Sequence, residues 1–303
     1  MGWLLALDLP SVRNICLVTG DPPLIALDAA DDRLVFFSAD SGAFYGWQAL
    51  PRPDGRDPLG NYSIAWLDTL RAPNGAVLPR VRIGAMTVLG AYDGRLHVIQ
   101  SGERAVKLAM DGEPVDLLRD HAADVLVVGL DRELGTVGVL TDDGALHVFQ
   151  QHVAVGTYSV GVARGHRPSV FLPDATGTII VGDEERTRVF DMAGRLLAQA
   201  PCAAMLGAAE VAPAGEWIVR YGGMRGAIQA YDARLTAVRQ GAGEDLRAAS
   251  RSVQLFPAER TRDGEIEALA VADDGLLAFV QGQTLCCAHL STLAPLPSEQ
   301  ALL

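Results

Sequence analysis

The sequence predicts an all-β fold built from repeated antiparallel sheets, and three observations lead to this prediction. Apolar residues come in short runs of 5–7, separated by turns rich in Gly and Asp. Long stretches with apolar residues at a helical period are absent from the chain. A hairpin sequence also recurs along the chain, which indicates a repeat architecture.

The recurring hairpin is clearest at residues 86–100 and 137–150, which read MTVLGAYDGRLHVIQ and VGVLTDDGALHVFQ. Each copy joins two apolar runs through an Asp-Gly pair. Asp-Gly in that position is a strong signal for a tight hairpin, because the turn needs a positive φ. Weaker copies cover residues 178–191, 217–232 and 276–289.

The second strands of these copies read RLHVIQ, ALHVFQ, RTRVFD, AIQAYD and TLCCAH, and they begin at residues 95, 145, 186, 227 and 284. The two middle spacings are 41 residues. Further strands flank each hairpin, which gives about four antiparallel strands per repeat. Four strands at a period of about 40–45 residues are the blade of a β-propeller.

Three segments resemble the later strands of WD-repeat blades: residues 91–99, 141–149 and 187–191. The Trp-Asp pair itself is absent, and Val-Phe-Asp and Ala-Tyr-Asp stand in its place. The segments 25–28 and 3–8 are more weakly similar to quinoprotein-like propellers. The resemblance implies a divergent WD-repeat-like propeller over most of the chain.

The number of blades depends on how the N-terminal strands are assigned. If residues 14–20 and 24–28 form the repeated hairpin, the long gap before residue 95 holds a divergent blade and the total is seven. If residues 33–38 and 43–48 form it, residues 1–22 supply closing strands and the total is six. Seven is the favoured count, and six is the alternative.

We expect one propeller domain over residues 1–303 with two insertions. The first lies near 49–61, where Pro and Gly are frequent, and the second lies near 241–264, where the chain is polar and has room for one helical turn. Insertions in a repeat scaffold project from one face and often carry binding residues.

Composition restricts the cellular setting and the partners. No apolar run approaches the roughly 20 residues that a spanning helix needs, and the N-terminus lacks the basic start of a signal peptide. The prediction is a cytoplasmic protein without membrane insertion. A formal net charge of −12 argues against nucleic acid as a partner. Lys107 is the only lysine among many arginines, which indicates a GC-rich, bacterial genome.

No sequence motif of a cofactor, metal or catalytic site emerges. The nucleophile elbow, the Walker loop and the zinc-protease motif are all absent, and Gly222–Gly226 reads as a hairpin turn. The adjacent Cys286 and Cys287 point to opposite faces of one strand, so they share neither a bridge nor a ligand. His97 and His147 occupy the same place in two repeats, and we expect them to pack or hydrogen-bond between neighbouring blades.

The candidate contact residues are aromatic and arginine side chains near two turns, because Trp, Tyr and Arg dominate binding hot spots. They are expected to be exposed. They are Trp47, Arg52, Arg56, Tyr62 and Trp66 around the first insertion, and Arg220, Tyr221 and Arg225 around a later turn.

These observations favour a non-catalytic scaffold that binds other proteins as a subunit of a larger assembly. Two alternatives stay open at this point. One is a propeller-type hydrolase or lactonase with a metal in a central channel, and the other is a sensor of a small ligand. Fold does not imply function, so a propeller architecture is compatible with all three.

Overall fold

The structure is a computed structural model that describes residues 12–29, 33–50, 67, 70–83, 86–103, 105–110, 114–119, 121–161, 168–201, 208–222, 226–255, 264–282 and 284–296. Within these residues the chain divides into two compact units. Unit 1 comprises Met1–Ala49 with Ala203–Leu303, and unit 2 comprises Leu50–Cys202. A single domain over residues 1–303 stays a prediction.

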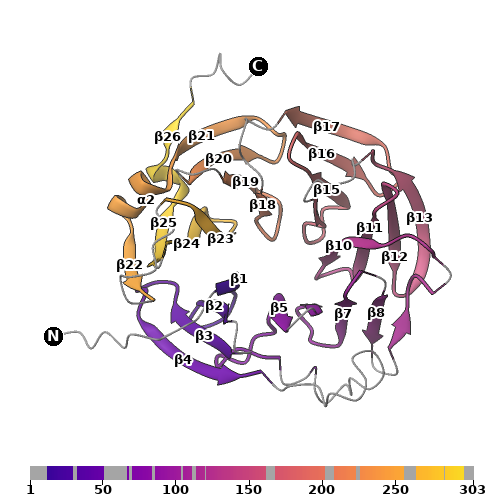
Figure 1. Cartoon of the computed structure of the whole chain (residues 1–303), viewed down its shortest axis with the longest axis horizontal. Helices are drawn as coiled ribbons and strands as arrows, with labels where there is room; N and C mark the ends of the chain where they lie inside the picture. The colour runs from indigo at the N-terminus through magenta and orange to yellow at the C-terminus, as the bar shows by residue number, and fades with distance from the viewer. Residues whose placement is uncertain are drawn as a thin grey trace. The chain divides into compact units, whose positions relative to one another are not determined.

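Unit 1 holds three antiparallel sheets, each a blade of a β-propeller (Figure 1). Blade 1 has the order β1 (Val12–Val18), β2 (Leu24–Ala29), β3 (Arg33–Ser38) and β4 (Phe44–Ala49). Blade 5 has the order β18 (Ala208–Val211), β19 (Trp217–Gly222), β20 (Ala227–Asp232), β21 (Ala237–Ala242) and β26 (Ala294–Pro295). Blade 6 has the order β22 (Arg251–Gln254), β25 (Thr284–His289), β24 (Leu276–Gln281) and β23 (Ile266–Val271).

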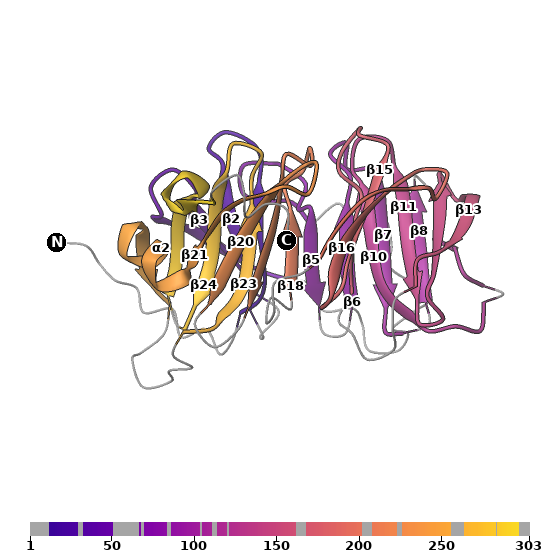
Figure 2. The ribbon, with the colours of Figure 1, turned by 90° about the horizontal axis from the view of Figure 1, so that it is seen from above.

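Unit 2 holds the other three blades, whose strands run antiparallel side by side (Figure 2). Blade 2 has the order β5 (Arg80–Ile83), β6 (Met86–Gly90), β7 (Leu96–Ser101), β8 (Ala105–Met110) and β9 (Val115–Asp116). Blade 3 has the order β10 (Val125–Asp131), β11 (Thr136–Thr141), β12 (Ala145–Gln150) and β13 (Val153–Ser159). Blade 4 has the order β14 (Ser169–Phe171), β15 (Thr178–Gly182), β16 (Arg186–Asp191) and β17 (Leu196–Pro201).

The all-β propeller fold is confirmed, with six blades in the described part of the chain. The preference for seven blades is therefore corrected to the alternative of six. The reason is that β1 to β4 all belong to one sheet, in which Arg33–Ser38 is the third strand. In the seven-blade assignment this strand follows the repeated hairpin and would be the fourth of its blade. In the six-blade assignment it opens the hairpin and would be the second.

The repeated Asp-Gly turns form as the sequence predicts. Gly94 and Gly144 have φ values of 73° and 81°, which favour glycine. The preceding aspartates stabilise the turns, because Asp93 Oδ1 accepts the Arg95 N–H at 2.9 Å and Asp143 Oδ1 accepts the Ala145 N–H at 3.1 Å. Local chemistry is sufficient to specify these hairpins.

Blade 2 differs from its neighbours in where its copy of the hairpin lies. In blades 3 and 4 the first turns contact each other, since Ala175 N–H donates to Asp131 Oδ2 at 3.2 Å. In blade 2 it is the β6–β7 turn that contacts the first turn of blade 3, through Tyr92 N–H and the Arg132 carbonyl at 3.4 Å. Strand β6 also contacts β10, as β10 contacts β14. The β6–β7 hairpin thus holds the place of β10–β11, and β5 is an additional strand.

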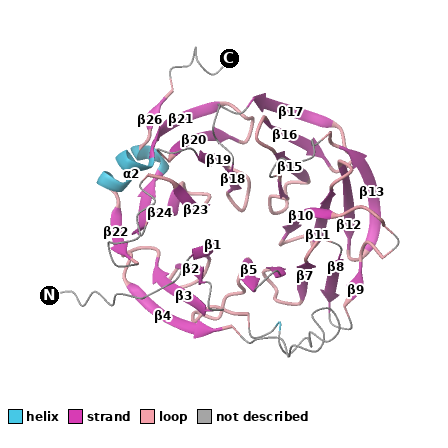
Figure 3. Cartoon of the chain, viewed as in Figure 1, coloured by secondary structure: helices cyan, strands magenta, loops and turns pink. Residues whose placement is uncertain are grey.

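The predicted insertion near 241–264 is not only a loop. It contains α2 (Gly243–Ala249), the helix drawn in cyan beside β22 in Figure 3, and then β22 itself. Strand β22 pairs with β25, with Arg251 opposite Cys287. Correspondingly, the chain after β25 forms the 3₁₀ helix η1 (Leu290–Thr292) and pairs through β26 with β21 of blade 5. Blades 5 and 6 therefore exchange edge segments.

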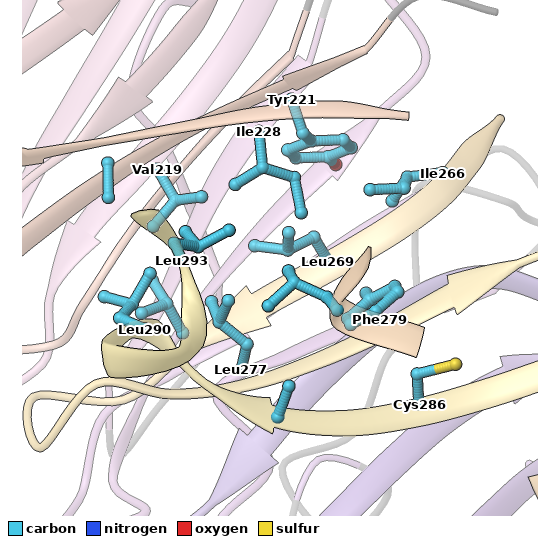
Figure 4. Close-up of a cluster of buried hydrophobic side chains, with 14 of the residues drawn as sticks. Val219, Tyr221, Ile228, Ile266, Leu269, Leu277, Phe279, Cys286, Leu290 and Leu293 are labelled. Carbon is cyan, nitrogen blue, oxygen red and sulfur yellow. The ribbon is translucent and has the colours of Figure 1, made fainter. Parts of the chain in front are cut away.

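Apolar side chains between neighbouring blades form the core. Figure 4 shows the cluster between blades 5 and 6, where Ile228 of β20 meets Leu269 and Phe279 of blade 6. Leu290 and Leu293 from the segment after β25 complete this cluster and anchor that segment to the core. A second cluster joins blade 6 to blade 1, where β1 contacts β23.

Candidate functional site

The described residues supply no clear site for metal or nucleophilic chemistry. No group of three or more His, Cys, Asp or Glu side chains converges among them. Cys286 belongs to the core cluster between blades 5 and 6, whereas Cys287 belongs to the cluster between blades 6 and 1, so the two thiols point to opposite faces as predicted. Burial raises the pKa of the Cys286 thiol, and it raises the pKa of Cys287 to about 11. Both thiols are protonated and unreactive at neutral pH.

The described part of the chain contains no helix whose length and apolar composition would let it cross a bilayer.

His147 is the centre of a buried polar network in blade 3. Its Nε2 lies 3.3 Å from Thr141 Oγ1, and Thr141 donates to Asp143 Oδ1 at 2.7 Å. Its Nδ1 lies 3.1 Å from Thr157 Oγ1 on the edge strand β13. We assign the proton to Nε2, because the Thr141 hydroxyl proton is committed to Asp143. Burial lowers the pKa of His147, and the nearby His121 lowers it further.

The expectation that His97 and His147 lie at the contacts between blades is supported for His147. The His121 ring, on the segment that joins blades 2 and 3, lies 4.3 Å from the His147 ring in an edge-to-face arrangement. His97 is buried. His147 therefore packs on an inter-blade segment and ties three strands of blade 3 together, which is a structural role.

Two buried ion pairs lie where blades 3 and 4 of unit 2 meet, one within blade 4 and one between the two blades. Arg188 contacts Asp183 at 2.8 Å, and its other terminal nitrogen donates to the Val160 carbonyl at the end of blade 3. Arg132 of blade 3 contacts Asp174 of blade 4 at 2.9 Å. The Arg188–Val160 hydrogen bond and the Arg132–Asp174 pair hold blades 3 and 4 together. Among the described residues, the buried Arg188 Nε has no hydrogen-bond partner.

Several predicted contact residues are not where the sequence suggested. Arg220 is 1% exposed, and Tyr221 lies in the core cluster between blades 5 and 6. The expectation of an exposed side chain is therefore wrong for both, because β19 packs between its neighbours in the sheet and against blade 6. Five other candidates fall outside the described residues: Arg52, Arg56, Tyr62, Trp66 and Arg225.

The remaining candidate, Trp47, lies on an exposed aromatic strand. It is 60% exposed on β4, and Phe44 and Tyr45 of the same strand are exposed as well. The Arg33 guanidinium, at the start of β3, lies 5.9 Å from the centre of the Trp47 ring. The Phe44 ring packs edge-on against the buried Phe37, which holds β4 to the blade. We call Arg33, Phe44, Tyr45 and Trp47 the β4 surface.

The position of Tyr45 follows from a bulge that recurs in other blades. In blade 1, Phe36 pairs with Gly46 and Phe37 pairs with Phe44, so Tyr45 is an extra residue in β4. The same two-against-one pairing makes Val155 extra in β13 and Leu197 extra in β17. Tyr45, Val155 and Leu197 are 45%, 49% and 56% exposed. Each bulge thus presents a large apolar side chain to solvent.

Sequence reasoning missed this set of bulge residues. The signal was present, since each lies two or three residues after the turn that follows a strand containing an apolar residue and then Phe, as in Phe36-Phe37 or Val148-Phe149. The sequence does not show where one strand carries an extra residue opposite its neighbour, and only the pairing registers reveal that these three are displaced outward.

Comparisons with known proteins indicate the fold and no more. No family model matches the chain, and no curated protein matches it. Solved structures do match: Raptor from Chaetomium thermophilum superposes with a TM-score of 0.64 at 9% sequence identity. The likeness is one of fold. The match covers 94% of this chain and 28% of the Raptor chain, so this chain spans less than a third of that protein. The divergent WD-repeat assignment stays a prediction.

Proposed function

We propose that the chain is a non-catalytic protein-interaction module, a scaffold or subunit that binds other proteins through the β4 surface. The observation that supports this proposal most is the exposure of three aromatic side chains on β4, with the Arg33 guanidinium 5.9 Å from the centre of the Trp47 ring. Aromatic residues and arginine are the types that most often dominate interface energetics. A large exposed aromatic surface also has a solvation cost unless a partner covers it.

The test is affinity capture from an extract of the cells that encode the chain, with the bound proteins identified and quantified. We expect Trp47→Ser to weaken capture of a specific partner by at least about tenfold, as loss of a hot-spot tryptophan does. The matched control is Leu134→Ser, because Leu134 is a similarly exposed apolar residue on the β10–β11 turn. The proposal fails if Trp47→Ser and Leu134→Ser capture the same proteins in the same amounts as the unaltered chain, with all three equally folded by circular dichroism.

A further inference from the structure

The outer strand of blade 3 is attached to its blade at a pair of histidines. His147 Nδ1 lies 3.1 Å from Thr157 Oγ1 of β13, and the His121 ring lies 4.3 Å from the His147 ring in an edge-to-face arrangement. We propose that His121 and His147, the histidine pair, form a pH-sensitive switch: when His147 takes up a proton, β13 opens away from β12 while the rest of blade 3 stays folded. The inference goes beyond the proposed function and does not depend on the β4 surface.

β13 is the strand of blade 3 that can open by itself. It is the last strand in the order β10-β11-β12-β13, and it pairs with β12. Five of its seven residues are exposed, whereas all six residues of β11 are buried. Segments with few buried contacts open locally at a smaller free-energy cost than core strands do. A weakened contact between β12 and β13 therefore acts on β13 before it acts on the other strands.

Protonation of His147 weakens that contact. The ring is 4% exposed, and Thr157 lies opposite it in the sheet as well as within hydrogen-bond distance of Nδ1. Because Nε2 carries the proton of the neutral ring, a second proton must bind at Nδ1, which now accepts from the Thr157 hydroxyl. The second proton reverses this hydrogen bond and places a positive charge in a buried position, where it is disfavoured. Opening of β13 lets water reach the ring and relieves that cost.

The sign of the pH dependence follows from the two states of the strand. In the closed blade, burial lowers the pKa of His147 below the value of 6.5 of a solvated histidine. The open state therefore binds the proton more readily than the closed state. The protection that neutral His147 gives to β13 is complete above pH 6.5, and it is lost as the pH falls through 6.5 toward the lower pKa of the closed state. The depth of this loss is set by the difference between the two pKa values.

Two charged neighbours change that difference in opposite directions. After burial, which is the largest cause, a charged His121 lowers the pKa of His147 further by repulsion, and Asp143 in the β11–β12 turn raises it by attraction. His121 thus deepens the switch, and Asp143 limits it. The other carboxylates on these two segments are Asp124 and Asp142, which are joined by a hydrogen bond from the Asp124 N–H to Asp142 Oδ1 at 3.1 Å.

The experiment is hydrogen exchange of the full chain between about pH 7.5 and about pH 5, the range in which histidine usually changes its charge. We expect the protection factors of residues 153–159 of β13 to fall with the pH, while those of residues 136–141 of β11 do not change. In His147→Gln the fall at β13 should be absent. Equal losses in β11 and β13 would overturn the proposal, because they would show that the proton weakens the whole blade. A fall that persists in His147→Gln would overturn it as well.

Two variants that keep His147 make the test independent of the folding of His147→Gln. His121→Phe retains a ring without its charge, so β13 should lose less protection than in the unaltered chain. Asp143→Asn removes the attraction, so β13 should lose more. The control is His152→Asn, at an exposed histidine in the turn before β13 whose φ of 63° suits asparagine, and it should match the unaltered chain. Circular dichroism at the higher pH verifies that each variant is folded. The opposite order of the two charge variants, or a loss of the pH dependence in His152→Asn, would contradict the proposal.

Discussion

The outer edge strands of the six blades fall into two groups of three, which differ in their length and in their content of charged residues and proline. Here the outer edge is the one opposite the strands that contact neighbouring blades. Blades 2, 5 and 6 end in the short strands β9, β26 and β22, of two, two and four residues, which contain Asp116, Pro295 and Arg251. Blades 1, 3 and 4 end in β4, β13 and β17, of six, seven and six residues, without a charged side chain.

In natural proteins, short edge strands, charged side chains and prolines prevent the edge of a sheet from pairing with other chains. Blades 2, 5 and 6 use all three devices. Blades 1, 3 and 4 have only their bulges, and Pro201 at the end of β17. Under the proposed function, the long, apolar edges of blades 1, 3 and 4 are the ones expected to contact other proteins.

The largest expected effect distinguishes an anchored edge segment from an open one. Leu293 is 3% exposed and anchors the segment that covers β21, so Leu293→Ala should lower the free energy of unfolding by about 2–5 kcal/mol. The same substitution at Leu197, on the open edge of blade 4, should change it by less than about 0.5 kcal/mol. Urea unfolding followed by tryptophan fluorescence measures both. Equal losses would mean that Leu197 is also buried against part of the protein.

A smaller effect is expected from pH, and it concerns the open edge of blade 3. The pKa of His147 is lowered in the folded chain, mainly by burial, while an unfolded histidine titrates near 6.5. The unfolded chain therefore binds this proton more readily. The stability that neutral His147 provides is complete above pH 6.5 and is lost as the pH falls through 6.5 toward the lower folded pKa.

His147 contacts Thr157 of β13. The protection factors of the β13 amides, which are already corrected for the intrinsic pH dependence of exchange, should therefore fall as the pH is lowered. The groups that face His147 are Thr141, Thr157, His121 and Asp143, of which the last favours the charged form and opposes the shift. His147→Gln should remove this extra pH dependence. An unchanged pH profile in that variant would assign the effect to another group.

The smallest effect on stability should accompany a clear effect on solubility. Val155→Lys places a charge at the bulge of an open edge, and we expect a change within about 0.5 kcal/mol in the free energy of unfolding because the side chain is exposed. Light scattering during heating should start at a higher temperature, since the edge is now protected. Val115→Lys on the already charged edge strand β9 is the control and should bring no such gain. Equal gains at both positions would indicate a general effect of net charge.

Sequence reasoning succeeded where structure is specified locally. The Asp-Gly turns at Gly94 and Gly144 and the four-stranded repeats follow from residues adjacent in the chain. It failed where distant segments meet. The hairpins at 86–100 and 137–150 are nearly identical in sequence but hold different places in their blades, because the packing of β6 on β10 sets the position of the first. The polar segment Arg251–Gln254 becomes a strand only because β25, more than thirty residues later, pairs with it.

The candidate site was predicted in part. Trp47 was identified from residue type, and its exposure is confirmed. Arg220 and Tyr221 have the same residue types, but packing of β19 in blade 5 and against blade 6 buries them, and local sequence does not encode that. Arg33 and Tyr45 were missed because their importance depends on cross-strand geometry: Arg33 lies near the Trp47 ring across two strands, and Tyr45 is displaced by a bulge.

Hydrogen exchange of the chain alone and in a complex purified with its native partner tests the central claim most directly, which is that the open edges are the binding edges. The account predicts that exchange slows at residues 44–49 of β4 when the partner is bound, while residues 237–242 of β21, already covered by β26, do not change. Slower exchange confined to the turns between strands, with β4 unchanged, would contradict it.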